Sequence, residues 1–259
     1  MLNAWVKFLD LETIQDITRG GVEKVAGRWE VQNTRWRWVR ALTAFCRWCL
    51  DREYLAIHPL PRVSVKYDSA PESDKRQRAL TEDELNSLLE VSPQSHQLWY
   101  ITAIETGFRL SELQALRVSD YDSENRAIQL QGKFTKNGKP ARQFISRKLS
   151  KLLDSHVAGK EVNAKLLDIL SRASPTLQQD RQRANIEKIT HKGLAGWHSF
   201  RKTLRTRLDK VPGCTPKIAN AIMRHSEQGD VGLANYTDLD MKLLRQVFER
   251  TVRMSKFKY

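Results

Sequence analysis

A polar interruption constrains the fold of this chain more than any other feature. Residues Tyr67–Arg76 are polar, contain a proline and show no hydrophobic period, whereas apolar residues recur at helical spacing on both sides. A chain of 259 residues is long enough for two domains. We therefore predict a first domain at residues 1–66, a linker at residues 67–78 and a second domain at residues 79–259.

The first domain has the pattern of a small helical bundle. Leu11–Val25 and Thr34–Glu53 are amphipathic stretches, and Asn33 or Thr34 is expected to cap the second of them. Five arginines share the second stretch with several tryptophans: Arg35, Arg37, Arg40, Arg47 and Arg52. Such a row of guanidiniums is either a solvated helix face or a surface that contacts phosphates.

The second domain is predicted to be mainly helical. Thr81–Glu84 is a capping box at the start of a helix. Ala127–Ile145 predicts a β-hairpin around Asn137-Gly138, because this dipeptide accepts the positive φ angles of a tight turn. Further helical patterns lie at His96–Glu105, Lys148–Val157, Val162–Leu170 and Leu177–Ile186, the last expected beside the segment that holds His198. The expected fold class is α+β, mainly α with a small antiparallel hairpin or sheet.

Composition indicates the class of partner. The chain has 44 Lys and Arg against 30 Asp and Glu, a net charge of +14 and a pI near 9.8. This charge favours a phosphate backbone and predicts affinity that falls steeply with salt, although charge alone does not separate DNA from RNA or an anionic membrane. No apolar run of roughly eighteen residues and no secretion signal is visible, so we expect a protein of the bacterial cytoplasm and nucleoid without a membrane partner.

The cysteines do not predict a metal site. Cys46 and Cys49 form a C-x-x-C, but no second pair completes a zinc site, and Cys214 is isolated. Cys46 and Cys49 fall at helical spacing with Leu42 and Phe45, so both thiols are expected on a packed helix face. We expect neither a metal nor another cofactor.

Polar segments of the second domain carry chemistry suited to a phosphodiester. In chain order they contain Arg109, His198 with Arg201, His225, and Tyr236 eleven residues later. The transition state of phosphoryl transfer spreads negative charge over oxygens that a planar, permanently charged guanidinium can hold in pairs. A phenol is a weak nucleophile at neutral pH and needs nearby cations or a proton acceptor. Taken singly, each residue is also an ordinary surface or half-buried side chain, so it is their order that favours a site.

That order resembles the signature of the tyrosine recombinase, or phage integrase, family. The family carries an arginine in T-G-x-R-x-S-E-L, an H-x-x-R pair, a later histidine and a nucleophilic tyrosine; this chain has T-G-F-R-L-S-E-L, H-S-F-R, His225 and Tyr236. The resemblance implies Arg109 and Arg201 as a phosphate clamp, His198 as the base and His225 as a donor to the phosphate. It implies that Tyr236 forms a 3′-phosphotyrosine link to DNA, without ATP or a metal ion.

The family also places a catalytic lysine on the hairpin, where it protonates the departing 5′ oxygen. Lys136 is the first choice here. Lys133 is the alternative, because the sequence does not fix the register of the hairpin. Lys139, beyond the turn, is expected to contact a phosphate.

The resemblance further implies a two-domain, DNA-clamping architecture with an integrase-like catalytic domain at residues 79–259. Residues 1–66 would be the helical, SAM-like core-binding domain, which looks short by about one helix at its amino end, as in a truncated gene, a wrongly chosen start or a minimal variant. The candidate DNA contacts are Arg35, Arg37, Arg40, Arg47, Lys133 and Lys139. Double-stranded DNA is the expected partner of a monomer or weak oligomer that becomes a homotetramer in the synapse. The implied role is site-specific integration or excision of a mobile element.

Two other functions use the same residues. A catalytically inactive remnant would bind DNA as a regulator, which the short amino end favours. A type IB topoisomerase would nick and reseal DNA without exchanging partners, but such enzymes usually carry a lysine where this chain has His198. Covalent phosphotyrosine formation separates the first alternative from a recombinase, and partner exchange separates the second.

The last part of the chain carries an apolar stripe. Leu243, Leu244, Val247 and Phe248 recur at near-helical spacing and are followed by basic residues. A stripe of this kind more often packs against its own domain. In the family, a terminal segment can instead dock on the neighbouring protomer, so the sequence leaves both arrangements open.

Overall fold

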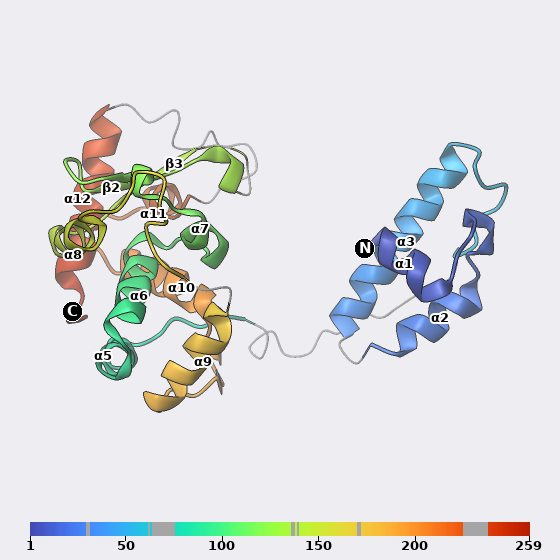
Figure 1. Cartoon of the computed structure of the whole chain (residues 1–259), viewed down its shortest axis with the longest axis horizontal. Coiled ribbons are helices and arrows are strands. Elements are labelled where there is room, and N and C mark those ends of the chain that lie inside the picture. Colours follow the sequence, from blue (N-terminus) through green and yellow to red (C-terminus); the bar gives the residue numbers. More distant parts are fainter. Residues whose placement is uncertain are drawn as a thin grey trace. The chain divides into compact units, whose positions relative to one another are not determined.

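The computed structural model divides into two compact units, Met1–Pro71 and Glu72–Tyr259, which are described separately (Figure 1). It describes residues 1–29, 32–61, 63, 76–135, 138, 140–169, 172–224 and 238–259. The boundary between the units falls inside the range predicted for the linker. The end of that range, Arg76–Arg78, is bonded to the second unit, because Arg78 N donates to Leu194 O at 2.8 Å and Leu194 N donates to Arg76 O at 2.8 Å.

The first unit is helical. Its described elements are α1 (Leu2–Leu9), the 3₁₀ helix η1 (Ile14–Asp16), α2 (Arg19–Gly27) and α3 (Gln32–Asp51). The prediction of one helix over Leu11–Val25 is wrong, because Thr18 has an extended backbone and its hydroxyl accepts a hydrogen bond from Gly21 N at 3.2 Å. A threonine hydroxyl used in this way starts a new helix rather than continuing the old one. The next predicted helix is confirmed, but α3 begins at Gln32, so neither Asn33 nor Thr34 is its cap.

The core of the first unit combines tryptophan rings with the thiols of α3. Trp5 is buried, and its Nε1 donates to Trp38 O at 3.1 Å, which satisfies the indole N–H inside the core. Cys46 and Cys49 are fully buried beside Leu42. Burial raises the pKa of the Cys46 thiol to about 11, so this sulfur is not a nucleophile at neutral pH. The prediction that both thiols lie on a packed helix face is confirmed.

The second unit is also mainly helical. Its described α-helices are α5 (Glu82–Val91), α6 (Gln94–Thr106), α7 (Leu110–Ala115), α8 (Arg147–Val157), α9 (Ala173–Arg183), α10 (Trp197–Leu208), α11 (Pro216–Met223) and α12 (Asp238–Met254). The capping box is confirmed: Glu84 N donates to Thr81 Oγ1 at 3.1 Å, and Thr81 N donates to Glu84 Oε2 at 2.8 Å. The helix α9 does lie beside the His198 segment, because Trp197 Nε1 donates to Ala173 O at 3.0 Å.

Short antiparallel strands complete the second unit. The strands β1 (Tyr121–Asp122), β2 (Ala127–Leu130) and β3 (Ala141–Phe144) follow the 3₁₀ helix η2 (Val118–Asp120) and form one sheet, while β4 (Ile189–Thr190) pairs with β5 (Gly193–Leu194). The predicted hairpin is present, but its strands separate after the pair Leu130↔Ala141. The connection then forms the 3₁₀ helix η3 (Gly132–Phe134), whose Phe134 packs against the core, so the paired strands end before the predicted turn. Asn137 lies outside the described residues.

The prediction of an amphipathic helix over Val162–Leu170 is wrong. Residues 162–169 contain no helix, although Leu166 and Leu167 are buried. Their backbone bonds to the segment after α7 instead: Leu166 N donates to Leu116 O at 3.0 Å, and Val118 N donates to Ala164 O at 3.0 Å. An apolar spacing typical of a helix was therefore produced by an irregular segment of turns and bends that buries Leu166 and Leu167.

The core of the second unit lies around α6 and α10, which pack against each other. One cluster gathers Leu85, Tyr100, Ile104 and Phe200 between α5, α6 and α10. A second cluster joins α10, α11 and α12 through residues such as Leu204, Leu208, Ile222, Leu244, Val247 and Phe248. In Figure 1, α6 and α10 lie at the centre of this unit, with α7, α11 and α12 around them.

The apolar stripe near the end of the chain packs within its own unit. Leu244, Val247 and Phe248 are buried, whereas Leu243 is 44% exposed and is not part of the packed face. Residues after α12 fold back onto α5, α6 and α8. There the Tyr259 hydroxyl donates to Glu105, and Lys258 N donates to Asn86 Oδ1 at 2.9 Å.

Candidate active site

The loop between α6 and α7 is the centre of the candidate site. Gly107 ends α6 with φ +60, a left-handed conformation, and a Cβ there would lie 3.0 Å from Leu204, so glycine suits the position in two ways. Arg109 then precedes α7. Its backbone N donates to Glu112 Oε2 at 2.9 Å, and its Nη1 donates to Glu112 Oε1 at 2.7 Å. The arginine side chain remains 39% exposed, so part of its donor fork faces solvent.

Arg201 lies beneath this loop. It comes from α10, is 2% exposed, and its Nη1 donates to Gly107 O at 2.6 Å. Its Nη2 donates to Met223 O, at the end of α11. This one guanidinium therefore ties the Arg109 loop to the point where α11 ends, which fixes three elements of the site relative to one another.

Arg224 joins the same cluster from α11. Its backbone is in the left-handed region with φ 55, which non-glycine residues rarely adopt. Its guanidinium lies 4.2 Å from the centre of the Phe108 ring, and its Nη2 lies 3.4 Å from both Gly107 O and Glu112 Oε2. Arg224 therefore shares a carbonyl with Arg201 and a carboxylate with Arg109.

The cluster holds more positive than negative charge. Among the ion pairs of the described residues, Arg109 and Arg224 share the carboxylate of Glu112, whose charge also acts on the nearby Arg201. Burial and the neighbouring Arg109 lower the pKa of Arg201 to about 10. Burial, with the charges of Arg201 and Arg109 and against the opposing effect of Glu112, lowers the pKa of Arg224 to about 9. Arg201 and Arg224 therefore remain cationic at neutral pH, so the cluster favours an anion.

His198 lies in the first turn of α10, one turn before Arg201, and its ring is exposed. Partial desolvation lowers its pKa, and the charges of Arg201, Arg109 and Lys202 lower it further. At neutral pH the imidazole is therefore uncharged and can accept a proton.

The structure brings only some of the predicted site residues together. Arg109 and Arg201 share a cluster, and His198 is beside them. Lys133 is exposed on η3, which contacts α7, and its Nζ lies 5.0 Å from the centre of the Phe134 ring. The predictions for Lys136, Lys139, His225 and Tyr236 lie outside the described residues.

Two members of the cluster were not predicted from the sequence to act there. Glu112 belongs to the T-G-F-R-L-S-E-L motif, and an acid three residues after Arg109 has the spacing of a capping pair. Arg224 lies outside the motifs that indicate the site. No sequence signal marks it, because its burial depends on the contacts with Phe108 and Gly107.

The predicted DNA contacts of the first unit differ in their surroundings. Arg37, Arg40 and Arg47 are exposed on α3, with the Arg40 guanidinium 4.8 Å from the centre of the Trp36 ring. Arg35 instead donates from Nη2 to Trp29 O at 2.8 Å, just beyond α2. Its charge therefore serves the packing of the unit.

Two kinds of feature are absent from the described residues. No group of three or more His, Cys, Asp or Glu side chains in the described part of the chain is arranged to hold a metal ion. None of the helices within the described ranges has the length and apolarity needed to cross a membrane.

Comparison with known families assigns the chain. The profile of the phage integrase family matches residues 78–242, which include the Arg109 loop, α10 and α11. The chain therefore belongs to the phage integrase family, whose members are tyrosine-type site-specific recombinases. A comparison with curated protein sequences found no match.

Solved structures show the same fold. A lambda integrase (residues 75–356) dimer bound to a COC′ core site is 15% identical, with a TM-score of 0.64 over 90% of this chain and 89% of that one. The Tn1549 transposon integrase in complex with transposon right end DNA is 17% identical, with a TM-score of 0.62 over 87% and 84%. The integrase from mycobacterium phage Brujita is 16% identical, with a TM-score of 0.53 over 95% and 82%.

Proposed function

We propose that this protein cleaves and rejoins duplex DNA through a covalent 3′-phosphotyrosine intermediate, for integration or excision of a mobile element. The observation that carries the proposal is the arginine cluster, in which Arg109 and Arg224 share Glu112 while Arg201 and Arg224 share Gly107 O. Such a cluster is preorganised for the charge that develops on a phosphodiester in the transition state. Membership of the family supports Tyr236 as the nucleophile, because His225 and Tyr236 follow the other motifs in the order that the family has.

The proposed step conserves the number of phosphate ester bonds. The Tyr236 hydroxyl attacks phosphorus, the P–O bond to the 5′ oxygen breaks, and the DNA 3′ phosphate becomes joined to tyrosine. His198 accepts the phenol proton, and a lysine of the β2–β3 connection, Lys136 or Lys133, donates a proton to the departing 5′ oxygen. Attack by a 5′ hydroxyl of another strand reverses the step, so rejoining requires no ATP.

The first unit is proposed to hold the DNA backbone. Arg37, Arg40 and Arg47 lie on the exposed side of α3, where positive charge can release counterions from phosphates. The structures of relatives include a lambda integrase tetramer bound to a Holliday junction. A homotetramer of this chain on paired DNA sites, formed from a monomer or weak oligomer, is part of the proposal.

The test is capture of the covalent intermediate. The full chain is incubated with nicked suicide duplexes taken from the flanks of its gene, and a denaturing gel is used to detect protein joined to DNA. We expect a band with the wild type that Tyr236→Phe abolishes, while Tyr259→Phe, a matched change of a second tyrosine, retains it. DNA binding that depends on salt without any covalent band would overturn the proposal and indicate a non-catalytic DNA-binding protein. Relaxation of supercoiled DNA without strand exchange would indicate a topoisomerase.

A further inference from the structure

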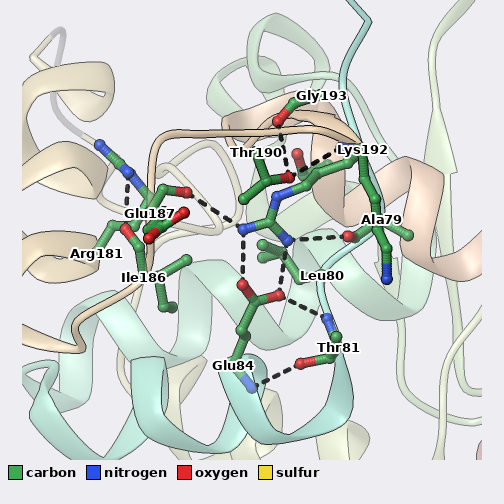
Figure 2. Close-up of polar contacts among 12 residues, drawn as sticks. Ala79, Leu80, Thr81, Glu84, Arg181, Ile186, Glu187, Thr190, Lys192 and Gly193 are labelled. Atoms are coloured by element: carbon green, nitrogen blue, oxygen red, sulfur yellow. Dashed lines mark hydrogen bonds and ion pairs between the residues drawn. The ribbon is translucent and has the colours of Figure 1, made fainter. Parts of the chain in front are cut away.

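The segment that enters the second unit, Arg76–Leu80, makes hydrogen bonds or ion pairs at almost every residue. Gln77 forms a parallel bridge with Leu194, which adds the segment to the edge of β5. Arg78 is 6% exposed and forms a two-pronged pair with Glu84, at 2.7 Å and 2.6 Å. Its guanidinium also donates to Glu187 O at 3.2 Å, on the segment before β4. Figure 2 labels Glu84 and Glu187, the two residues that accept these hydrogen bonds. The segment is therefore a strap held between α5 and the β4–β5 hairpin.

The same strap runs along the helix that carries His198 and Arg201. Leu80 N donates to Thr203 Oγ1 at 2.9 Å, in the second turn of α10. Nearer the start of α10, the Ser199 hydroxyl lies 3.4 Å from Gln77 Oε1 and 3.2 Å from Leu194 O. Ser199 Oγ in turn accepts a hydrogen bond from Gly196 N at 3.0 Å, which closes the first turn of α10.

Gly196 makes room for the Gln77 side chain. A Cβ at Gly196 would lie 2.8 Å from Gln77 Oε1, closer than real Cβ contacts come. The backbone of Gly196 is extended, with φ −152, so a side chain there would meet the glutamine without backbone strain. Glycine therefore suits position 196, because the Gln77 side-chain amide lies against the start of α10.

We propose that Gln77 is a positioning residue for the reaction, which fixes the first turn of α10 and hence the place of His198 beside the arginine cluster. The inference rests on the proposed function, because it assigns His198 to proton transfer. His198 itself is exposed, and the residue next to it, Ser199, is fully buried under the strap. A side chain that must approach a phosphate from the surface is thus oriented through its buried neighbour.

Two substitutions disturb this contact from opposite sides. Gln77→Ala removes the amide, and Gly196→Ala displaces it by occupying its space. We expect each to reduce the rate of covalent complex formation about three- to tenfold at saturating DNA, because misplacing a reacting group lowers the rate without changing the nucleophile. The double variant should be no slower than either single one, because both changes remove the same contact. Gln179→Ala, an exposed glutamine of α9, is the matched control and should cleave at the wild-type rate.

An NMR titration of His198 in the free protein separates positioning from loss of folding. If the first turn of α10 moves away from Arg201 and Arg109, the lowered pKa of His198 should rise toward its ordinary value in both variants, with little change in melting temperature. Cleavage rates and a His198 titration equal to wild type, or additive losses in the double variant, would overturn the inference. If the wild type forms no covalent band, the proposed function fails instead, and the titration alone decides whether Gln77 positions His198.

Discussion

Arg201 and Arg224 donate to backbone carbonyls in the interior of the second unit, whereas Arg37, Arg40 and Arg47 lie on an exposed face of the first. Exposed arginines act through summed charge, so each contributes a part of the affinity for a polyanion and none is indispensable. Arginines that must direct donors at one phosphate need fixed positions, which packing and carbonyl acceptors provide. We therefore propose two purposes for arginine in this chain, which differ in the surroundings of the side chain.

The largest effect is expected for Arg201→Ala. Covalent complex formation should fall at least roughly a thousandfold, because one member of the phosphate clamp is lost. The variant should also lose about 2–4 kcal/mol of folding stability, because Gly107 O and Met223 O are left without this donor. Gel assays of the covalent complex and chemical denaturation measure the two quantities. Cleavage within tenfold of wild type in a folded Arg201→Ala protein would remove Arg201 from the clamp.

A second prediction concerns pH and separates cleavage from binding. The pKa of His198 is lowered from its ordinary 6.5, so the neutral base persists at and above that pH, and the cleavage rate should fall only as pH drops below it. Because the folded pKa lies below the unfolded one, any stability from this group is present at higher pH and is lost as pH falls. His198→Gln should cleave roughly a hundredfold more slowly, and its cleavage rate should no longer fall at acidic pH. DNA affinity, which we attribute to the α3 arginines, should not fall over the same pH range in the wild type. A parallel fall of affinity and cleavage rate would contradict the assignment of His198 as the base.

Arg224→Gly tests the buried cluster with a smaller expected loss. Glycine accepts the left-handed backbone of this position, so the substitution removes the guanidinium while it relieves the φ of 55. Glu112 would then be shared by fewer cations, and we expect cleavage to slow roughly ten- to a hundredfold with DNA affinity nearly unchanged. Arg224→Lys keeps the charge but not the fork, and should recover only part of the rate. A wild-type rate in Arg224→Gly would show that the arginine serves only the backbone.

The smallest effects are expected on α3. Arg37→Ala, Arg40→Ala and Arg47→Ala should each weaken DNA binding a few-fold and lower the slope of log affinity against log salt by about one. The cleavage rate at saturating DNA should not change. Arg35→Ala is the contrasting control: it should lower the melting temperature, because it removes the bond to Trp29 O, while it changes the salt slope less. Equal salt slopes for Arg35→Ala and Arg37→Ala would show that exposure does not separate them.

Local chemistry explains which parts of the fold could be predicted. The capping box at Thr81 is a short-range pattern, and it forms as expected. The packed thiols of α3 also follow from spacing alone. Thr18 is the N-cap of α2 and so interrupts the expected helix. The sequence does not show whether a threonine in a periodic stretch will continue a helix or cap a new one. The helix predicted around Leu166 was wrong for a long-range reason, because the Leu166 backbone N–H is hydrogen-bonded to Leu116 O, far away in the sequence.

The candidate site shows the same division. The order of motifs predicted Arg109, Arg201 and His198, which the structure gathers around one loop. Arg224 could not be predicted as a partner, since its role depends on a left-handed backbone and on the Phe108 ring. Sequence motifs thus predicted the groups proposed to act on a substrate, while the residues that contact them became visible only in the packed structure.

The buried acid beneath the chain's last residues couples the folding of the second unit to protons. Glu105 is 3% exposed and accepts hydrogen bonds from Ser146 N, at 2.7 Å, and from the Tyr259 hydroxyl. Burial raises its pKa to about 7 from an ordinary 4.5, so between these values the carboxyl is protonated in the folded chain and ionised in the unfolded one. By linkage, its contribution to folding stability is complete below pH 4.5 and is lost as pH rises through 7. Unfolding of the second unit between these pH values would therefore release this proton to solvent.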